Sequence, residues 1–145
     1  MLSRRKSLKC LICSVLILVL AAETTAQESK LPDLTGFTKS PTEHQVVVIE
    51  QPFAVRSVRG VISFKNHAGE PLPRVLFEMI GPGDSKKIRR DTSSEDGNFK
   101  IVGVPQGSYR FKTTRDGFSS VFGTVVVSKR ADKTALIHID VPVGN

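Results

Sequence analysis

The feature that most limits how this chain can fold is a series of short apolar runs separated by turn-forming residues at close intervals. From residue 45 onward, Val, Ile and Phe alternate with polar residues, and pairs such as Asp96-Gly97 and Asp116-Gly117 separate the runs. Alternation with a period of two is typical of strands buried on one face, and Asp-Gly supplies the positive φ of a tight reversal. No segment after residue 26 keeps a helical period for three turns, so the sequence predicts an all-β fold.

The runs predict about seven or eight strands at a spacing of roughly 8–12 residues, which is typical of an antiparallel β-sandwich. They cover residues 45–50, 58–65, 74–80, 99–102, 108–113, 118–128 and 134–141, and residues 86–92 form a polar strand or a loop. The cleanest alternation places Tyr109 and Phe111 inward and Arg110 and Lys112 outward. We therefore expect one folded domain over residues 45–145.

The first 26 residues have the order of a secretory signal peptide. A basic region (Arg4–Lys9) precedes an uncharged, mainly apolar run of 12 residues (Leu11–Ala22), and Thr24–Ala26 provides small residues for cleavage. The run is shorter than the roughly 17–25 residues that a transmembrane helix needs. The sequence thus predicts a signal peptide over residues 1–26.

Cleavage is expected after Ala26, with cleavage after Ala21 or an uncleaved membrane anchor as the alternatives. The segment carries four cations and one Glu, so the mature chain keeps +4 of the formal net charge of +7. Cys10 and Cys13 lie in the signal, so the mature chain has no thiol for a disulfide or a metal site. The modest remaining charge argues against nucleic acid as a partner. We expect a secreted or periplasmic monomer with no stable membrane insertion after cleavage.

Residues 27–44 are predicted to form a flexible leader between the signal peptide and the folded domain. Two prolines and a glycine interrupt this segment, and it has no sustained period. Leu31, Leu34 and Phe37 are apolar side chains that could dock on a neighbouring surface. A loosely ordered tail is the expectation that we prefer.

Several turn motifs resemble those of a known family when they are taken in order. They are Gly60-Val61-Ile62, AGEPLPRV at 68–75, TSSEDGNF at 92–99, VPQGSY at 104–109 and Asp116-Gly117-Phe118. The set covers about residues 55–142 and resembles the carboxypeptidase regulatory-like domain, a transthyretin-like (prealbumin-like) β-sandwich. The sequence departs from the common pattern at Arg74, where a small residue often precedes the core Val.

The resemblance implies a non-catalytic module. Such domains pack beside the catalytic domain of metallocarboxypeptidases, and they also occur in exported bacterial proteins. Their fold is similar to that of starch-binding modules. No catalytic residue is carried over to this chain by the resemblance.

The densest basic run is a candidate site for an anionic partner. It consists of Lys86, Lys87, Arg89 and Arg90. Clustered cations attract acidic glycans, lipid headgroups or nucleic acid. The alternative, which we prefer, is an edge strand whose charges prevent edge-to-edge pairing.

Phe118 and Phe122 are the candidate platform for a bound sugar. Sugar faces stack on exposed aromatic rings, but the chain has no Trp and its single Tyr is expected to face inward. Carbohydrate binding is therefore kept as an alternative function.

The sequence predicts no catalytic, metal or cofactor site. His67 and Glu70 have the H-x-x-E spacing of zinc carboxypeptidases, but a catalytic zinc needs three protein ligands, and this pair lies in a turn. There is no G-x-S-x-G nucleophile motif and no phosphate loop.

The expected function is that of a non-enzymatic binding or scaffolding module. It would act on a protein partner through its loops or through an edge strand. The alternatives are a carbohydrate-binding module and an accessory domain for a separate metallocarboxypeptidase.

Overall fold

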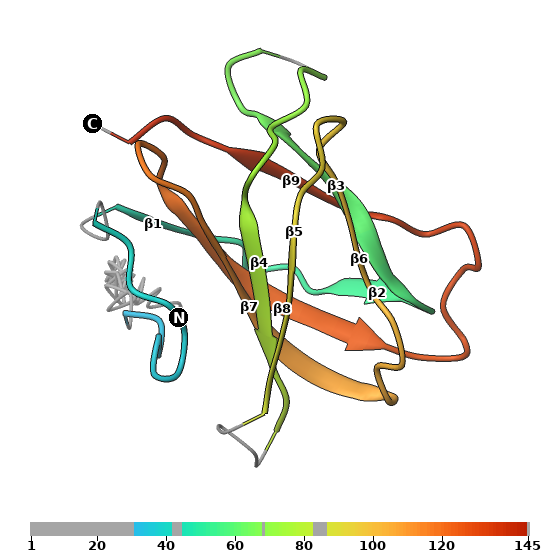
Figure 1. Ribbon diagram of the computed structural model, residues 1–145. Coiled ribbons are helices and arrows are strands. Elements are labelled where there is room, and N and C mark those ends of the chain that lie inside the picture. Colours follow the sequence, from blue (N-terminus) through green and yellow to red (C-terminus); the bar gives the residue numbers. More distant parts are fainter. Residues whose placement is uncertain (1–30, 42–44, 68, 83–86, 145) are drawn as a thin grey trace, which may run out of the picture. The chain divides into compact units, whose positions relative to one another are not determined.

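The fold is all-β in the part of the chain that the structure describes. The computed structural model describes residues 31–41, 45–67, 69–82 and 87–144 (Figure 1). Nine strands and no helix occur among these residues. They are β1 (Val46–Val48), β2 (Phe53–Val55), β3 (Val58–Phe64), β4 (Leu76–Ile80), β5 (Ile88–Thr92), β6 (Asn98–Ile101), β7 (Gly107–Thr114), β8 (Ser120–Val127) and β9 (Ile137–Val141).

Some predictions fall on residues outside this description. The predicted signal peptide over residues 1–26 lies outside it, as do residues 27–30 and 42–44 of the leader and Lys86 of the basic run. No helix of bilayer-spanning length and hydrophobicity occurs in the described part of the chain.

The strands form two sheets, and these are not closed into a barrel. The large sheet has the order β1-β8-β7-β4-β5, with β2 also paired to β8, and the small sheet has the order β6-β3-β9. The β4–β5, β4–β7, β7–β8 and β3–β6 pairs are antiparallel, as expected from the sequence.

The expectation of a wholly antiparallel arrangement is wrong for three pairs. Strands β1 and β2 run parallel to β8, and β9 runs parallel to β3. For β9 the reason is the β8–β9 connection. Residues 128–136 carry the chain from the end of β8 to the small sheet, at the same end as the start of β3. Strand β9 then runs in the same direction as β3.

Both sheets contribute to one hydrophobic core. Phe77 of the large sheet stacks on Phe99 of the small sheet at a centroid distance of 4.3 Å, and on Phe111 of β7 at 5.4 Å. Tyr109 and Phe111 are buried, as their alternation predicts. The core therefore binds the inner faces of the two sheets together.

Eight of the nine strands lie within or overlap the segments that the sequence predicts, and β2 is the exception. Strand β2 has only three residues and follows Pro52. It continues the edge that β1 begins along β8, after an interruption at residues 49–52. A run this short gives no alternation from which a strand can be predicted.

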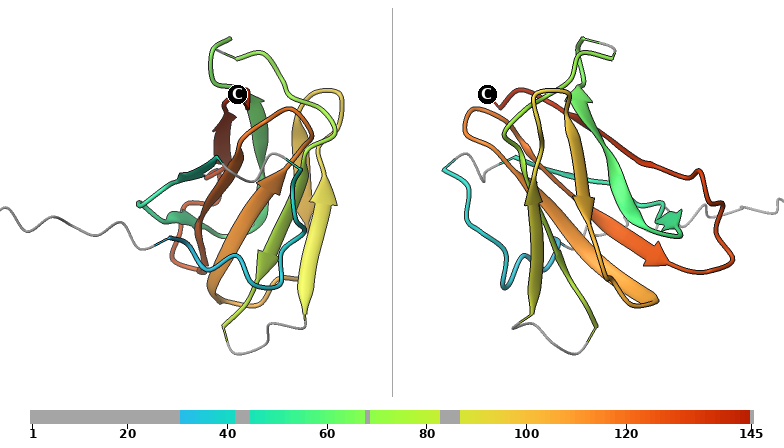
Figure 2. Two further views of the ribbon diagram at one scale, coloured as in Figure 1. Left: turned by 90° about the vertical axis from the view of Figure 1, so that its left-hand side faces the viewer. Right: turned by 45° about the vertical axis from the view of Figure 1, so that its right-hand side comes forward.

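The outer face of the large sheet, which is turned away from the small sheet, is covered by residues 31–41. This segment has no helix or strand, but Phe37 and Ser40 are buried within it (Figure 2). The described part of the leader, residues 31–41, thus packs against the large sheet. Lys112 points outward, as its alternation predicts, but its side chain lies beneath this segment and is fully buried.

Candidate functional site

Four connections converge at one end of the two sheets. The pairing places the start of β3, the end of β4, the end of β6 and the end of β8 at the same end; in Figure 1 the β2–β3, β6–β7 and β8–β9 connections lie toward the lower right, and the described ends of β4 and β5 lie at the bottom. We call this region the basic end, and its described residues are 56–59, 81–82, 87–89, 100–107 and 128–136. Three of the other four connections, β3–β4, β5–β6 and β7–β8, lie at the opposite end, and the β1–β2 connection runs along β8.

The basic end has a strong excess of positive charge. Its described residues carry eight Lys or Arg side chains and one carboxylate, that of Asp132. The eight cations are Arg56, Arg59, Lys87, Arg89, Lys100, Lys129, Arg130 and Lys133. Three of these cations (Arg59, Arg89 and Lys100) lie in strand ends, so the described loops of the basic end hold five cations and one carboxylate, whereas those of the opposite end hold three cations and four carboxylates. The positive charge is therefore concentrated at one end and is not spread over the surface.

Hydrogen bonds hold the long β8–β9 connection against its neighbours. Arg56 Nε donates to the carbonyl of Ala131 at 3.2 Å, and Arg59 Nη2 donates to that of Lys133 at 3.1 Å. The main-chain and hydroxyl hydrogen bonds from Thr134 lower the pKa of Asp132, which keeps that carboxylate charged within its own loop. The cations are thus presented on loops of fixed conformation.

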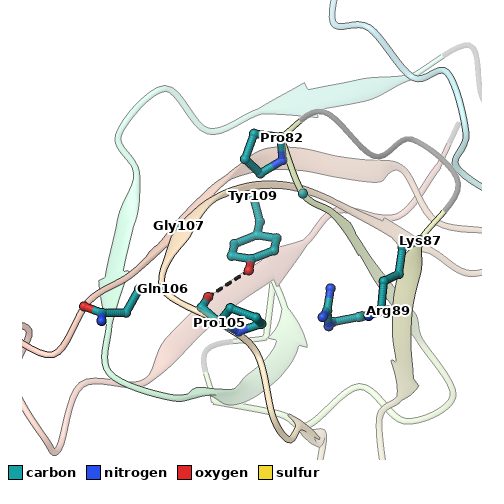
Figure 3. A pocket seen from close by; sticks show the side chains of 8 residues that line it. Pro82, Lys87, Arg89, Pro105, Gln106, Gly107 and Tyr109 are labelled. Carbon is teal, nitrogen blue, oxygen red and sulfur yellow. Dashed lines mark hydrogen bonds between the residues drawn. The ribbon is translucent and has the colours of Figure 1, made fainter.

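A cavity of about 210 Å³ opens between β5 and the β6–β7 loop. Lys87 and Arg89 form the β5 side, and Tyr109 and Pro105 face them across it (Figure 3). The Tyr109 hydroxyl donates to the Pro105 carbonyl at 2.7 Å, which fixes the loop over the buried ring. Two cations beside an apolar wall suit an anionic group on an otherwise apolar ligand, because guanidinium binds carboxylate through paired hydrogen bonds.

Two of the four residues in the predicted basic patch lie together at this cavity. Lys87 and Arg89 are two residues apart and share a face of the chain, and no carboxylate among the described residues pairs with either. Arg90 faces the other way and lies 3.7 Å from Glu78 on the outer face of the large sheet. The structure therefore brings Lys87 and Arg89 together and separates Arg90 from them.

Strand β5 is an edge strand, as the alternative interpretation of the basic run requires. Ser93 N–H donates to the carbonyl of Val75 at 2.9 Å, so odd-numbered residues make the bonds to β4. The main-chain groups of Ile88, Arg90 and Thr92 then point away from β4. Within the described chain no strand pairs with this flank.

The structure does not bring Phe118 and Phe122 together as a platform. Phe118 packs against the core beside Phe64, with ring centroids 5.4 Å apart. Phe122 faces the outer side of the large sheet, where Phe37 meets it edge-on at 6.1 Å. Each ring is half-buried against a different partner, so neither presents an open face beside the other.

His67 Nδ1 and Glu70 Oε2 lie 3.5 Å apart, and both side chains are exposed. Both lie on the β3–β4 turn, at the end opposite the basic end. No third His, Cys, Asp or Glu joins them to form a ligand cluster within the described residues.

Sequence reasoning missed most of the cations of the basic end because they lie in four separate connections. A usable signal was nevertheless present. When consecutive strands reverse direction, every second connection lies at the same end of the sheet. The charges of these alternate connections can therefore be summed to find a charged end. This sum would have identified Arg56, Lys100 and the Lys129–Lys133 loop as neighbours of Lys87 and Arg89.

Comparison with known proteins assigns no family to the chain. No protein-family model matches it, and no curated protein has a significantly similar sequence.

Proposed function

We propose that the chain is an exported, non-catalytic binding module of the carboxypeptidase regulatory-like type, folded as a transthyretin-like β-sandwich. It binds an extended, acidic segment of a partner protein along β5. The observation that carries this proposal is the free edge of β5, with which no strand pairs among the described residues and which leads directly into the cavity of Lys87 and Arg89.

An extended peptide can extend a sheet by pairing with an edge strand, and its side chains then supply the specificity. The cations of β5 disfavour pairing between two copies of this chain, because like charges would face one another. The same cations favour a partner with carboxylates at alternate positions. The edge is therefore selective rather than blocked.

The binding is expected to be weak and dependent on salt. Each main-chain hydrogen bond adds about 0.5–1.5 kcal/mol, and each exposed ion pair adds less than about 1 kcal/mol. A few of each add up to about 4–7 kcal/mol, which corresponds to a dissociation constant between about 10 micromolar and about 1 millimolar at low salt. Added salt should weaken the ionic part and leave the hydrogen bonds.

Support for the family resemblance comes from the β6–β7 turn. The Val104–Tyr109 motif forms this turn, and its Tyr closes a hydrogen bond to Pro105 four residues upstream. A comparable tyrosine hydrogen bond stabilises a strand corner in immunoglobulin-type sandwiches. The motif thus has a physical role at the position that the resemblance gives it.

The test uses a short labelled peptide that alternates Glu and Val, measured by fluorescence anisotropy at low and high salt. We expect the chain to bind it and the Lys87→Glu/Arg89→Glu variant to lose about tenfold or more in affinity, since each lost charge pair acts at close range. The matched control is Lys65→Glu, an exposed cation at the opposite end, which should bind as the unaltered chain does.

A second peptide separates strand pairing from charge attraction. It carries the same side chains with methylated main-chain nitrogens, which removes the N–H donors, and it should not bind. Equal binding of the methylated peptide, of duplex DNA or of the charge-reversal variant would contradict the proposal. Export is tested separately, by finding Gln27 as the first residue of the secreted chain.

A further inference from the structure

Residues 31–41 cross the outer face of the large sheet, and we call them the strap. A single strap residue, Thr38, is held by two charged side chains of the sheet. Its N–H donates to Glu78 Oε2 at 2.9 Å and its hydroxyl donates to Glu78 Oε1 at 2.8 Å. Its carbonyl accepts from Lys112 Nζ at 2.6 Å. The main chain and the hydroxyl of Thr38 are therefore all bound by side chains.

Glu78 and Lys112 are unusual because both are fully buried. They lie directly opposite each other on β4 and β7, and each has 0% exposure. Burying a charge costs several kcal/mol unless its hydrogen bonds are satisfied. A sheet that only needed to bury its outer face would do so better with apolar residues, so this pair points to a binding role.

The residue before Thr38 occupies an adjoining aromatic site. Phe37 is 8% exposed and meets the Phe122 ring edge-on at a centroid distance of 6.1 Å. The Arg110 guanidinium lies 5.6 Å from the Phe37 ring centroid, and it also pairs with Asp33 at 3.2 Å. A Phe-Thr pair is thus recognised through both its side chains and its main chain.

Elsewhere in the strap, the carbonyl and the carboxylate of Asp33 both contact Arg110. Phe37 and Ser40 are the buried residues of the strap, and Leu31 is 89% exposed. The strap forms no strand pairing with the sheet. Because no strand pairing holds the strap, a competing segment that offers the same Phe and Thr contacts can displace it.

We propose that this outer face is a peptide-binding site for extended segments that contain Phe followed by Thr, and that the strap occupies it in the same chain. The Glu78 carboxylate accepts an N–H and a hydroxyl from the ligand, and the Lys112 ammonium donates to a ligand carbonyl, as both now do with Thr38. A tethered occupant has an effective concentration of up to about millimolar, so the strap outcompetes weak free peptides. The site lies on a different face from the β5 edge and does not depend on the function proposed above.

The test uses full-length chains and a labelled peptide of residues 31–41. In the Phe37→Ala/Thr38→Ala variant the strap can no longer compete, so this variant should bind the peptide about tenfold or more tightly than the unaltered chain. The control is Leu31→Ala/Lys39→Ala, which changes two exposed strap residues and should bind as weakly as the unaltered chain. A peptide with Thr38→Val should bind the first variant much more weakly.

Circular dichroism establishes that each variant is folded. A folded Phe37→Ala/Thr38→Ala chain that binds no peptide would overturn the proposal, as would equal affinity in the variant and the unaltered chain. If that variant does not fold, Thr38→Val alone replaces it in the same assay, with the same expected direction and the same two contradicting results. Adding Glu78→Gln to the binding-competent variant should abolish peptide binding, and unchanged binding would place the peptide elsewhere.

Discussion

Substituting Tyr109 by Phe removes one hydroxyl and tests how the β6–β7 loop is held at the basic end. The Tyr109 ring is buried at 6% exposure, and its hydroxyl donates to the Pro105 carbonyl at 2.7 Å. Phe keeps the ring and its packing, so the change isolates this hydrogen bond. The loop that it fixes forms one side of the cavity opposite Lys87 and Arg89.

The magnitude follows from the position of the bond. A hydrogen bond of this kind contributes about 0.5–1.5 kcal/mol, and the freed Pro105 carbonyl can turn to solvent because Pro105 is exposed. We therefore expect a loss near 1 kcal/mol in the free energy of unfolding. For a domain of about 100 residues this lowers the Tm by about 4–8 °C. Tyr109→Ala also removes the ring and should cost about 3–5 kcal/mol.

The assay is thermal unfolding followed by far-UV circular dichroism. Ser108→Ala is the matched control, because Ser108 is exposed next to Tyr109 and its loss should leave the Tm unchanged. A Tyr109→Phe variant that melts with the unaltered chain would refute the reasoning, since the loop would then be held by something other than this bond. A loss as large as that of Tyr109→Ala would also refute it.

Two further changes test the small sheet and the strap. A Cβ on Gly60 would collide with the main-chain carbonyl of Ile137 on β9, so Gly60→Ala should lower the free energy of unfolding, measured by chemical denaturation, by about 3 kcal/mol or more. The control is Gly103→Ala, whose Cβ meets open space. It should lose only the roughly 1 kcal/mol that a left-handed backbone costs a residue other than glycine. The hydroxyl and main-chain hydrogen bonds from Thr35 hold the pKa of Asp33 below its ordinary value of 3.8. The stability that the charged Asp33 adds is therefore complete above that pH, and it is lost as the pH falls through the lowered pKa. Asp33→Asn should therefore show a smaller drop in Tm between about pH 5 and about pH 3, and an unchanged drop would count against this account.

The strand pattern was predictable because this core depends on simple alternation. In β9 the residues Ile137, Ile139 and Val141 are buried while His138 and Asp140 are exposed, as a period of two requires. Turn residues then mark where each strand ends. Strand direction was not predictable in this way, because a parallel pair and an antiparallel pair show the same alternation. The parallel β3–β9 pair depends on where the β8–β9 connection crosses, and no local residue encodes that.

The candidate sites were predictable only where they lie within one strand. Lys87 and Arg89 are close in sequence, so their cluster was visible, but the cations that join them come from three other connections. Lys112 shows a different limit. Its neighbours alternate as those of a solvent-facing residue would, and only the strap, some 70 residues earlier in the chain, covers it. An aperiodic segment gives no signal of what it will bind.

The geometry of β5 explains why the basic run serves two faces rather than one patch. Successive side chains of a strand point to opposite sides, so Arg89 reaches the cavity while Arg90 reaches Glu78 on the outer face. Glu78 Oε1 is shared, because it accepts from the Thr38 hydroxyl at 2.8 Å and lies 3.7 Å from Arg90 Nη2. Arg90 therefore supports the strap site rather than the β5 edge. Since the two sets of cations are separated by the pleat, reversing the charges of Lys87 and Arg89 should leave the strap bound, and the two proposed sites can be tested independently in one chain.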